Sequence, residues 1–550
     1  MAKVKAANGL VRCLQKEGVP WVACYPTNHV NNALGQEGLP IVMMGEERFA
    51  VAVADAYSRV TQGKGIGVCT IMANLNAAGI QMAFGAIGQA YEDSSSVLVI
   101  AEGVNRGASR HTHFDMPGAL KAVSKWVGVI DQGELVPDYV RRAFTHLRSG
   151  RPGPVVLILP RDAGEYDEDE HPYTPVKRWR SGPDPEDVKA AIGALQAAKS
   201  PMIYAGEGVL YADATEELRQ FAELAQLPVL TTLKAKSALP ESHPLALGAR
   251  GNLAHTFMND SDLIFSIGTS LFPGRFSHTI PNAASKTIIQ CTVDLLDINR
   301  SYETKHALIG DAKLSLQALI AELKAQGVVE ERAGLLDKIE AGREEFWGKF
   351  RPWMESNEQP INPYRVFGDL QKVLDPKNSF VTADSGNTRD QTSTVYQAEI
   401  PRGYMGWGNV STLGFSLAGA IGAKLAFPDR QVVNVTGDAG VMYMMGNFEA
   451  CARYKIGLTT IHINNGGYSG YGPGFWGEGH DPFTFKVSDH TEASMSAMAK
   501  AVGWYGEMVS EPSEVIPALK RALAANEEKR PAYLEFICSQ HPVHGGWVGR

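Results

Sequence analysis

The sequence predicts an α/β protein with three doubly wound domains, each built on a parallel sheet. Short apolar runs alternate with longer helical patterns along nearly the whole chain, which is typical of parallel sheets covered by helices. The chain has 550 residues, 44% of them hydrophobic, which is more than one core usually holds. Two polar, proline-containing stretches, residues 164–187 and 354–363, separate three blocks. We expect a first domain, a central domain, a linker helix and a third domain over residues 1–170, 185–328, 329–355 and 356–550.

Each block contains runs that we expect to be buried strands. In the first block, after an amphipathic N-terminal helix, they are "GIGVCTIM", "SSVLVIAEG" and "GPVVLILP". In the central block they are "SPMIYAGEG", "PVLTTLKAK", "SDLIFSIG" and "TIIQCTVD". In the third block they are "NSFVTADSG", "RQVVNVTGD", "LTTIHINN" and "PAYLEFICS". The 56 glycines spread through the chain suit the many tight turns that such an arrangement needs.

Charge and cysteine content exclude several classes of protein. The net charge of −8 is mild for this length, and we find no basic run of the kind that binds nucleic acid. The six cysteines are scattered without a Cys-x-x-Cys pair, which argues against a zinc site and a disulfide framework. The N-terminus has no signal-peptide pattern, and no apolar stretch approaches the roughly 18–20 residues of a membrane span. We expect a cytoplasmic protein that contacts neither nucleic acid nor membrane.

One carboxylate, Asp438, stands among small residues between two apolar runs in "VTGDAGVMY". We expect the strand before it to be followed by a helix over residues 441–455 and then by the strand "LTTIHINN". A right-handed crossover makes the two strands parallel, so that Asp438 and Asn465 lie at the same carboxyl edge. Ligands of open α/β sheets bind at that edge, and carboxylate, amide and carbonyl oxygens suit Mg²⁺ held together with a diphosphate. A loop carboxylate that only caps a helix is the alternative interpretation.

The spacing of these residues resembles the thiamine-diphosphate motif, which runs from Gly-Asp-Gly to Asn-Asn. Here the Gly-Asp-Ala triplet around Asp438 is followed by an Asn-Asn pair, with 26 residues between Asp438 and Asn465. The resemblance implies that Asp438 and Asn465 ligate Mg²⁺ through their side chains, and Gly467 through its carbonyl. Ala439 stands where the family usually has glycine.

Essentially the whole chain is similar to the acetohydroxyacid synthase, benzaldehyde lyase and 2-hydroxyacyl-CoA lyase (oxalyl-CoA decarboxylase) group. In that group a pyrimidine-binding domain comes first, a central domain second and a diphosphate-binding domain third. The resemblance implies thiamine diphosphate and Mg²⁺ as cofactors, and leaves open whether the central domain holds ADP, FAD or neither. It also implies a homo-oligomer, a dimer of dimers, in which domains of different subunits share each cofactor.

A second signature lies in "MMGEERFAVAVADAYSR". Its tail, residues 54–59, resembles the family's Ala-Asp-Gly-Tyr-Ala-Arg, and counting back to the family's glutamate reaches Glu47 rather than Glu46. By that resemblance, Glu47 protonates or hydrogen-bonds the aminopyrimidine ring of the coenzyme. Burial that raises the pKa of a glutamate toward neutrality makes such proton sharing possible. The alternative is a first-turn glutamate that complements the helix dipole, which is our interpretation of Glu46.

Further contacts with the coenzyme follow from the same resemblance. Leu413 matches the bulky residue that holds the coenzyme in its bent form, although an ordinary core leucine is the alternative. The stretch "ADSGNTRD" resembles a turn that contacts the diphosphate, and Tyr468 follows the metal-binding turn. The predicted cofactor-binding residues are Gly386, Asn387, Thr388, Ser411, Leu413, Gly437, Asp438, Ala439, Gly440, Asn465, Gly467 and Tyr468.

The substrate end departs from the family pattern at two places. Where the family usually has Gly-Pro-Gly, this chain has "IMANLNAAG", with amides at Asn74 and Asn76. Where the family usually has Phe-Gln-Glu, this chain has Phe-Asp-Met, which places Asp115 near the expected reaction centre. Because these residues would face the substrate, the departures leave the substrate class open.

Three histidines are candidates for acid–base chemistry. His111 and His113 flank the Phe-Asp-Met segment, and without a third ligand a metal site there is a poor interpretation. His29 lies in the first βα loop of the first domain, which in several relatives reaches the active site. The predicted catalytic residues are Glu47, His29, His113 and Asp115.

The predicted reaction makes or breaks a carbon–carbon bond next to a carbonyl group. The enzyme would be a 2-hydroxyacyl-CoA lyase, a 2-oxo acid decarboxylase or a carboligase acting on a small-molecule substrate. The cofactor does the difficult chemistry, while the protein orients the reactants. Three alternatives stay open: an acetolactate-synthase-like carboligase on free 2-oxo acids, an FAD-dependent enzyme of the pyruvate oxidase type, and a catalytically silent homologue.

Overall fold

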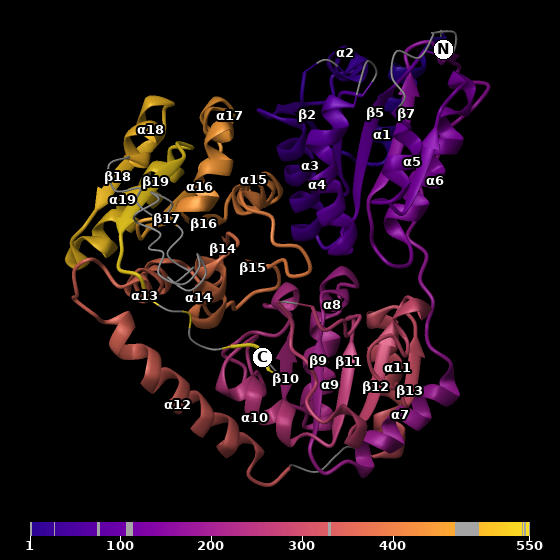
Figure 1. The fold of residues 1–550 in the computed structure, drawn as a ribbon. Helices are drawn as coiled ribbons and strands as arrows, with labels where there is room; N and C mark the ends of the chain where they lie inside the picture. The colour runs from indigo at the N-terminus through magenta and orange to yellow at the C-terminus, as the bar shows by residue number, and fades with distance from the viewer. Residues whose placement is uncertain are drawn as a thin grey trace. The chain divides into compact units, whose positions relative to one another are not determined.

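The computed structural model describes residues 3–26, 28–73, 77–105, 114–274, 276–327, 332–467, 494–541, 543 and 546–548. The described chain forms three fully parallel sheets flanked by helices, two with six strands and one with five (Figure 1). This arrangement confirms the predicted fold class. The chain divides into two compact units, of which one holds residues 1–180, 421–426 and 449–454 and the other holds the remainder.

The first unit is built on a six-stranded sheet of order β3-β2-β4-β5-β7-β6. Its strands are β2 (Val22–Cys24), β3 (Ile41–Met43), β4 (Gly67–Ile71), β5 (Val97–Gly103), β6 (Trp126–Val129) and β7 (Val155–Pro160), and a short antiparallel pair joins β1 (Val4–Lys5) to β8 (Glu165–Tyr166). Its helices are α1 (Ala6–Lys16), α2 (His29–Gln36), α3 (Glu47–Val60), α4 (Ala78–Glu92), α5 (Met116–Lys121) and α6 (Val136–Arg148). The sheet is doubly wound, because α1, α2 and α6 share a core with one face while α3 and α4 pack on the other.

Helix α3 is buried along most of its length because small residues bring it close to the sheet. A Cβ added at Gly67 would lie only 1.8 Å from the carbonyl oxygen of Ala54 in α3. The Ser58 hydroxyl also accepts a 2.7 Å hydrogen bond from the Gly67 amide. This close packing fixes the start of α3, which is Glu47, relative to the carboxyl edge of the sheet.

The second unit contains the central sheet, of order β10-β9-β11-β12-β13. Its strands are β9 (Pro201–Ala205), β10 (Val229–Thr231), β11 (Leu263–Ile267), β12 (Thr287–Thr292) and β13 (His306–Ile309). Its helices are α7 (Pro185–Ala197), α8 (Gly208–Tyr211), α9 (Thr215–Ala225), α10 (Asn252–Asp260) and α11 (Ala312–Gln326). A long helix, α12 (Leu335–Met354), then leads to the last sheet of the chain.

The last sheet, also in the second unit, has the order β15-β14-β16-β17-β19-β18. Its strands are β14 (Ser379–Ala383), β15 (Tyr404–Met405), β16 (Gln431–Gly437), β17 (Thr459–Asn464), β18 (Tyr505–Val509) and β19 (Ala532–Ile537). The helices that follow α12 in the chain are α13 (Pro363–Val373), α14 (Asn387–Val395), α15 (Phe415–Ala426), α16 (Asp438–Met444), α17 (Phe448–Arg453), α18 (Met495–Ala501) and α19 (Val515–Glu527). Residues 421–426 of α15 and 449–453 of α17 belong to the first unit. Strands β14, β16 and β17 are neighbours, so the loops at their carboxyl ends converge.

The helix expected over residues 441–455 differs from the prediction. It begins three residues earlier, at Asp438, and a 3-10 turn over Met445–Asn447 divides it into α16 and α17. Glycine and asparagine in this turn are poor helix formers, which explains the interruption. The early start matters most, because it places Asp438 in the first turn of a helix, beside its free N–H groups.

Candidate functional site

The carboxyl edge of the last sheet brings together the residues of the predicted metal motif. Asp438 is 5% exposed and begins α16 directly after β16. Its Oδ2 accepts hydrogen bonds from the amides of Asn465 and Gly467, at 3.2 and 3.1 Å. The turn after β17 is therefore in direct contact with the carboxylate, as the motif spacing predicts.

The other oxygen of this carboxylate is held by a histidine. The Nε2 of His462 lies 3.0 Å from Asp438 Oδ1, and the Tyr533 hydroxyl lies 2.8 Å from His462 Nδ1. Because an ionised carboxylate only accepts, Nε2 carries the proton and the tyrosine donates to Nδ1. Burial acts to raise the pKa of Asp438, but the hydrogen bonds from His462 and the 465–467 turn hold that pKa below its ordinary value. Asp438 is thus an oriented, buried anion.

These residues fit Mg²⁺. Across the described segments, no three His, Cys, Asp or Glu side chains gather in a way that could hold a metal. A metal at this edge would therefore draw on one carboxylate together with amide and carbonyl oxygens, a donor set typical of Mg²⁺ shared with phosphate oxygens. Asp438, Asn465 and Gly467 offer that set, and φ values of 90° and 104° at Gly466 and Gly467 give the turn its sharp path.

Two helix N-termini meet beside this carboxylate. Gly386, with φ of 106°, precedes α14, which starts at Asn387, and the Thr388 hydroxyl donates to the Asp384 carbonyl at 3.1 Å. A Cβ on Gly437 would lie 3.5 Å from Thr388 Cγ2, so the starts of α14 and α16 adjoin. Free N–H groups at two adjacent helix starts form a suitable place for a diphosphate.

Of the two small residues after Asp438 at the start of α16, Gly440 has no room for a side chain, whereas Ala439 has. A Cβ on Gly440 would lie 2.4 Å from Thr436 Oγ1 and 3.0 Å from Asp384 Cγ, so this position needs glycine. Ala439 is partly exposed, and its methyl group is accommodated in the first turn of the helix. Alanine at this position is therefore compatible with a helix that starts at Asp438.

Asp384 holds the segment that carries Ser411 and Leu413. Its carboxylate accepts hydrogen bonds from the Gly414 amide at 2.9 Å and from the Ser416 hydroxyl at 2.7 Å. The Ser411 hydroxyl in turn contacts the Ser385 hydroxyl. Complete burial raises the pKa of Asp384 to about 6, although these hydrogen bonds act to lower it. The loop is thus tied to the end of β14.

The raised pKa of Asp384 predicts a pH-dependent stability. The carboxyl binds its proton more tightly in the folded than in the unfolded chain, so its contribution to stability is full below pH 4 and is lost as pH rises through 6. Between pH 5 and 7.5 we expect the wild type to lose about 1 kcal/mol relative to Asp384→Asn, which does not titrate. Urea denaturation of both proteins at the two pH values measures this difference, and parallel pH curves would contradict it.

In the first unit, Glu47 is the first residue of α3 and is 4% exposed. A Cβ added at Gly79, near the start of α4, would lie 2.7 Å from Glu47 Oε1. Burial raises the pKa of Glu47, and the charge of Glu46 raises it further. Glu46 itself is the more exposed N-cap residue, and its side chain makes no capping hydrogen bond. Of these two neighbouring carboxyls, only Glu47 therefore has the environment of a proton-sharing group.

His29 lies at the carboxyl edge of the same sheet, as the first residue of α2. Its Nδ1 is 3.1 Å from Oε1 of Glu102, which lies near the end of β5. The same oxygen accepts a 2.5 Å hydrogen bond from Nε of Arg161, which follows β7. The structure thus joins a predicted histidine to two charged residues that the sequence did not single out.

In the structure, the side chain of Asp115 caps a helix. It is exposed, and its Oδ1 accepts a 3.1 Å hydrogen bond from the Gly118 amide as the N-cap of α5. A catalytic role for Asp115 stays a prediction. Several other candidates lie outside the described residues: Asn74, Asn76, His111, His113 and Tyr468.

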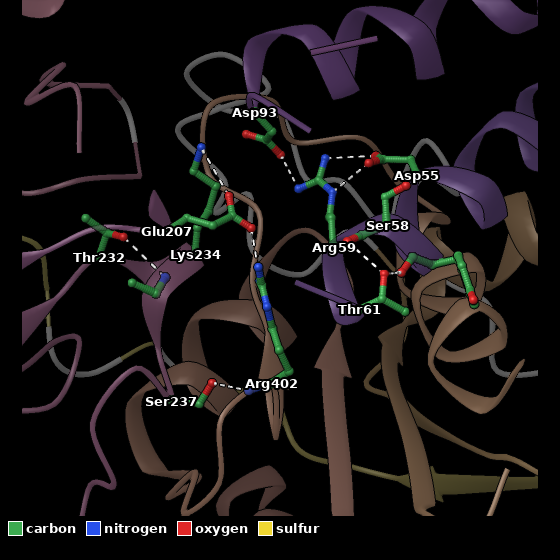
Figure 2. Close-up of polar contacts among 12 residues, drawn as sticks. Asp55, Ser58, Arg59, Thr61, Asp93, Glu207, Thr232, Lys234, Ser237 and Arg402 are labelled. Atoms are coloured by element: carbon green, nitrogen blue, oxygen red, sulfur yellow. Dashed lines mark hydrogen bonds and ion pairs between the residues drawn. The ribbon is translucent and has the colours of Figure 1, made fainter. Parts of the chain in front are cut away.

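A nucleotide would be expected at the switch point of the central sheet, between β9 and β11. There the two loops bond directly, from the Gly206 amide to Ile267 O at 2.8 Å and from the Gly208 amide to Gly268 O at 2.9 Å. Between these glycines stands Glu207. Figure 2 shows this carboxylate with Lys234 and Arg402. Lys234 Nζ lies 3.9 Å from Glu207 Oε2, and Arg402 Nη1 lies 3.2 Å from Glu207 Oε1. Because the two loops bond to each other and Glu207 takes up the charges of both cations, these residues do not form a phosphate cradle and do not fit ADP or FAD at the switch point.

Sequence reasoning missed several functional candidates that share one signal. His462, Tyr533, Glu102 and Asp384 are polar residues in or directly after buried strands, as in "LTTIHINN" and "VLVIAEG". Burying such groups is costly unless they are paired, so an isolated polar residue in an apolar strand indicates a partner. The partner itself is far away in sequence, and only the fold identifies it.

Comparison with known proteins adds to this geometry. The family description "Thiamine pyrophosphate enzyme, N-terminal TPP binding domain" matches residues 4–122, the corresponding central domain matches 188–319, and the C-terminal TPP binding domain matches 384–536.

Among the described helices, none is long and apolar enough to cross a membrane.

Curated relatives match over nearly the whole chain. A probable acetolactate synthase large subunit from Methanocaldococcus jannaschii is 28% identical, covering 97% of this chain and 92% of its own length. Acetolactate synthase isozyme 3 large subunit from Escherichia coli K12 is 27% identical, covering 98% and 95%. Acetolactate synthase from Mycobacterium bovis is 26% identical, covering 98% and 88%.

Proposed function

The chain belongs to the thiamine pyrophosphate enzyme family, and we propose that it is a Mg²⁺-dependent carboligase that joins two carbonyl compounds, with free 2-oxo acids as substrates. The observation that carries the proposal is the oriented anion Asp438 beside the starts of α14 and α16. The three relatives described above are all acetolactate synthases by name, which supports 2-oxo acids over acyl-CoA thioesters as substrates. This choice favours one of the alternatives that the sequence left open over the 2-hydroxyacyl-CoA lyase.

In this proposal the last sheet binds the diphosphate end of the coenzyme. Asp438, Asn465 and Gly467 hold Mg²⁺, while the N–H groups at the starts of α14 and α16 bind the phosphates. Leu413 contacts the body of the coenzyme, and we propose the same role for Tyr468, which lies outside the described residues. The residues proposed to line the diphosphate are Gly386, Asn387, Thr388, Ser411, Gly437, Ala439 and Gly440.

The first unit supplies the proton chemistry. Bound thiamine diphosphate provides a nucleophilic carbon and an electron-accepting ring. Glu47 holds a proton at its buried carboxyl, where a raised pKa lets it share that proton with a ring nitrogen. His29 moves a proton at Nε2, to or from the carbonyl oxygen of the substrate. The central sheet takes no redox cofactor in this proposal, because its two loops bond to each other at the switch point and Glu207 takes up the two nearby cations.

We also propose that the enzyme works in the cytoplasm as a homo-oligomer, a dimer of dimers. Apolar side chains on α4 support this, because Met82 is 45% exposed and Phe84 is 37% exposed. On α16, Met442 and Tyr443 are 46% and 47% exposed. Large apolar side chains left exposed on these two helices support a surface that another chain covers.

Hydrogen–deuterium exchange at C2 of the bound coenzyme tests the proposal without knowledge of the substrate. We expect the wild type, loaded with Mg²⁺ and thiamine diphosphate, to exchange this proton rapidly, and Glu47→Gln to slow the exchange on the order of a hundredfold. Quenched-flow NMR measures the rate.

Glu46→Gln is the matched control, because it alters the neighbouring carboxylate, whose side chain is 27% exposed. It should exchange at nearly the wild-type rate, because burial, and not the charge of Glu46, is the largest cause that raises the pKa of Glu47. A wild-type protein that binds the coenzyme without accelerating its exchange would be a silent homologue, and the proposed function would be wrong.

A further inference from the structure

We propose that Glu102 is the positioning residue for His29, holding it in the tautomer that leaves Nε2 for proton transfer, and that Arg161 keeps Glu102 ionised for this task. The inference rests on the proposed function, in which His29 exchanges a proton with the substrate. It concerns a cluster of three side chains at the carboxyl edge of the first sheet.

The position of Glu102 is unusual for a charged residue. It lies in β5, a strand whose seven residues are all buried, and its side chain is 0% exposed. Burying a carboxylate is energetically unfavourable unless charges and hydrogen-bond donors compensate it. Burial alone raises the pKa of Glu102, but hydrogen bonds from His29 and Arg161 bring it below its ordinary value. The carboxylate therefore stays ionised at neutral pH.

The path of the chain brings His29 to this carboxylate across the switch point of the sheet. Strand β4 separates β2 from β5, so the loop after β2 must cross the end of β4. Asn28 guides the crossing, because its Nδ2 donates to the carbonyls of Ile71 and Ile100 at 2.9 and 3.2 Å. Its Oδ1 also caps α2 by accepting from the Val30 amide at 2.9 Å. The loop is thus built to hold His29 over β5.

The contact with Glu102 determines the tautomer of His29. Because the ionised carboxylate only accepts, Nδ1 carries the proton in the contact of 3.1 Å. In the neutral imidazole, Nε2 then carries the lone pair, and within the described residues it makes no hydrogen bond. His29 is 15% exposed, so this nitrogen lies near the surface of the edge where substrates of such sheets bind.

One oxygen of the carboxylate points to a role beyond pairing with arginine. Arg161 and His29 both contact Oε1, while Oε2 is buried without a hydrogen-bond partner in the part of the chain that the structure describes. A purely structural ion pair would favour the two-oxygen contact that arginine makes elsewhere in this unit, between Arg59 and Asp55. Here Arg161 contacts only one oxygen of Glu102, and His29 hydrogen-bonds to the same oxygen.

The inference predicts the tautomer of the wild-type protein. In protein labelled with 15N-histidine, with the His29 signals assigned by their loss in His29→Asn, neutral His29 should carry its proton on Nδ1. This measurement needs neither substrate nor variant of Glu102. A proton on Nε2 would overturn the inference.

Kinetics give the second test, with pyruvate as the probe substrate. In Glu102→Gln we expect kcat to fall about 10- to 100-fold with KM changed less than about threefold, the usual range for residues that orient a reacting group. Glu102→Asp, which restores the charge, should recover part of the rate. The C2 exchange of the coenzyme should stay at the wild-type rate, because Glu47 and not His29 governs it.

Glu17→Gln is the matched control at the opposite edge of the same sheet. Its side chain is also 0% exposed and pairs with an arginine, Arg148, but it lies at the end of α1. A loss of kcat in Glu102→Gln no greater than in Glu17→Gln would reduce Glu102 to a structural residue. Failure of the proposed function can be told apart from failure of this inference. If the proposed function is wrong, the wild type shows no C2 exchange. The NMR measurement of the His29 tautomer still tests whether Glu102 positions His29.

Discussion

Replacing Asp438 by alanine should weaken Mg²⁺-dependent binding of thiamine diphosphate on the order of a thousandfold, the effect of removing the charged partner of a buried ion. Within the metal motif it is the only charged ligand. The change also leaves the Nε2–H of His462 and the amides of Asn465 and Gly467 without their acceptor. Calorimetric titration of the apo protein with the coenzyme, with and without Mg²⁺, measures the loss.

A buried carboxylate of the same domain provides the control. Asp369 on α13 has a side chain that is 0% exposed and pairs with Arg365 and Lys372, away from the carboxyl edge. Asp369→Asn should lower stability and leave the affinity for the coenzyme near that of the wild type. If Asp438→Ala bound the coenzyme as tightly as wild type in the presence of Mg²⁺, the anchor proposed at this edge would be wrong.

The sequence predicted the parts of the site that depend on strand ends. Asp438 and Asn465 could be placed at one edge because a crossover rule relates consecutive strands, and the structure shows them in contact. The distinction between Glu47 and Glu46 came from the resemblance of residues 54–59 to the family motif, and the different burial of the two side chains agrees with it. Both predictions used a short stretch of sequence or the relation between two consecutive strands.

The rest could not be predicted, because it depends on partners that are distant in sequence. Glu102 meets His29 across 73 positions, and Tyr533 meets His462 across 71. The periodicity of a strand indicates which side of the sheet a residue faces, but not which loop crosses above it. Helix 441–455 was misplaced for a local reason, since its capping geometry starts at Asp438. Buried polar residues in apolar strands therefore indicate where a functional site lies, but the sequence does not identify their partners or the reaction.

Replacing Arg59 by methionine should cost the protein about 3–5 kcal/mol of unfolding free energy, because it leaves two buried carboxylates without their counter-ion. Figure 2 shows the Arg59 guanidinium between Asp55 and Asp93. It donates to both oxygens of Asp55, at 3.0 and 2.8 Å, and to Asp93 at 3.0 Å, and all three side chains are 0% exposed. Arg59→Lys should recover only part of the loss, because one ammonium group cannot reproduce this fork. Urea denaturation followed by circular dichroism measures both variants.

The surface pair of Arg141 and Asp138 is the control for this prediction, since their side chains are 47% and 59% exposed. Arg141→Met should change stability by less than about 1 kcal/mol, as for other solvated ion pairs. Arg59 and Asp55 lie on α3, whose first residue is Glu47, so the buried cluster also anchors the helix that presents the proposed proton donor. An Arg59→Met protein that unfolds at the urea concentration of Arg141→Met would show that the buried cluster contributes no more to stability than a solvated ion pair. The fixed position of α3 would then have to come from its apolar packing alone.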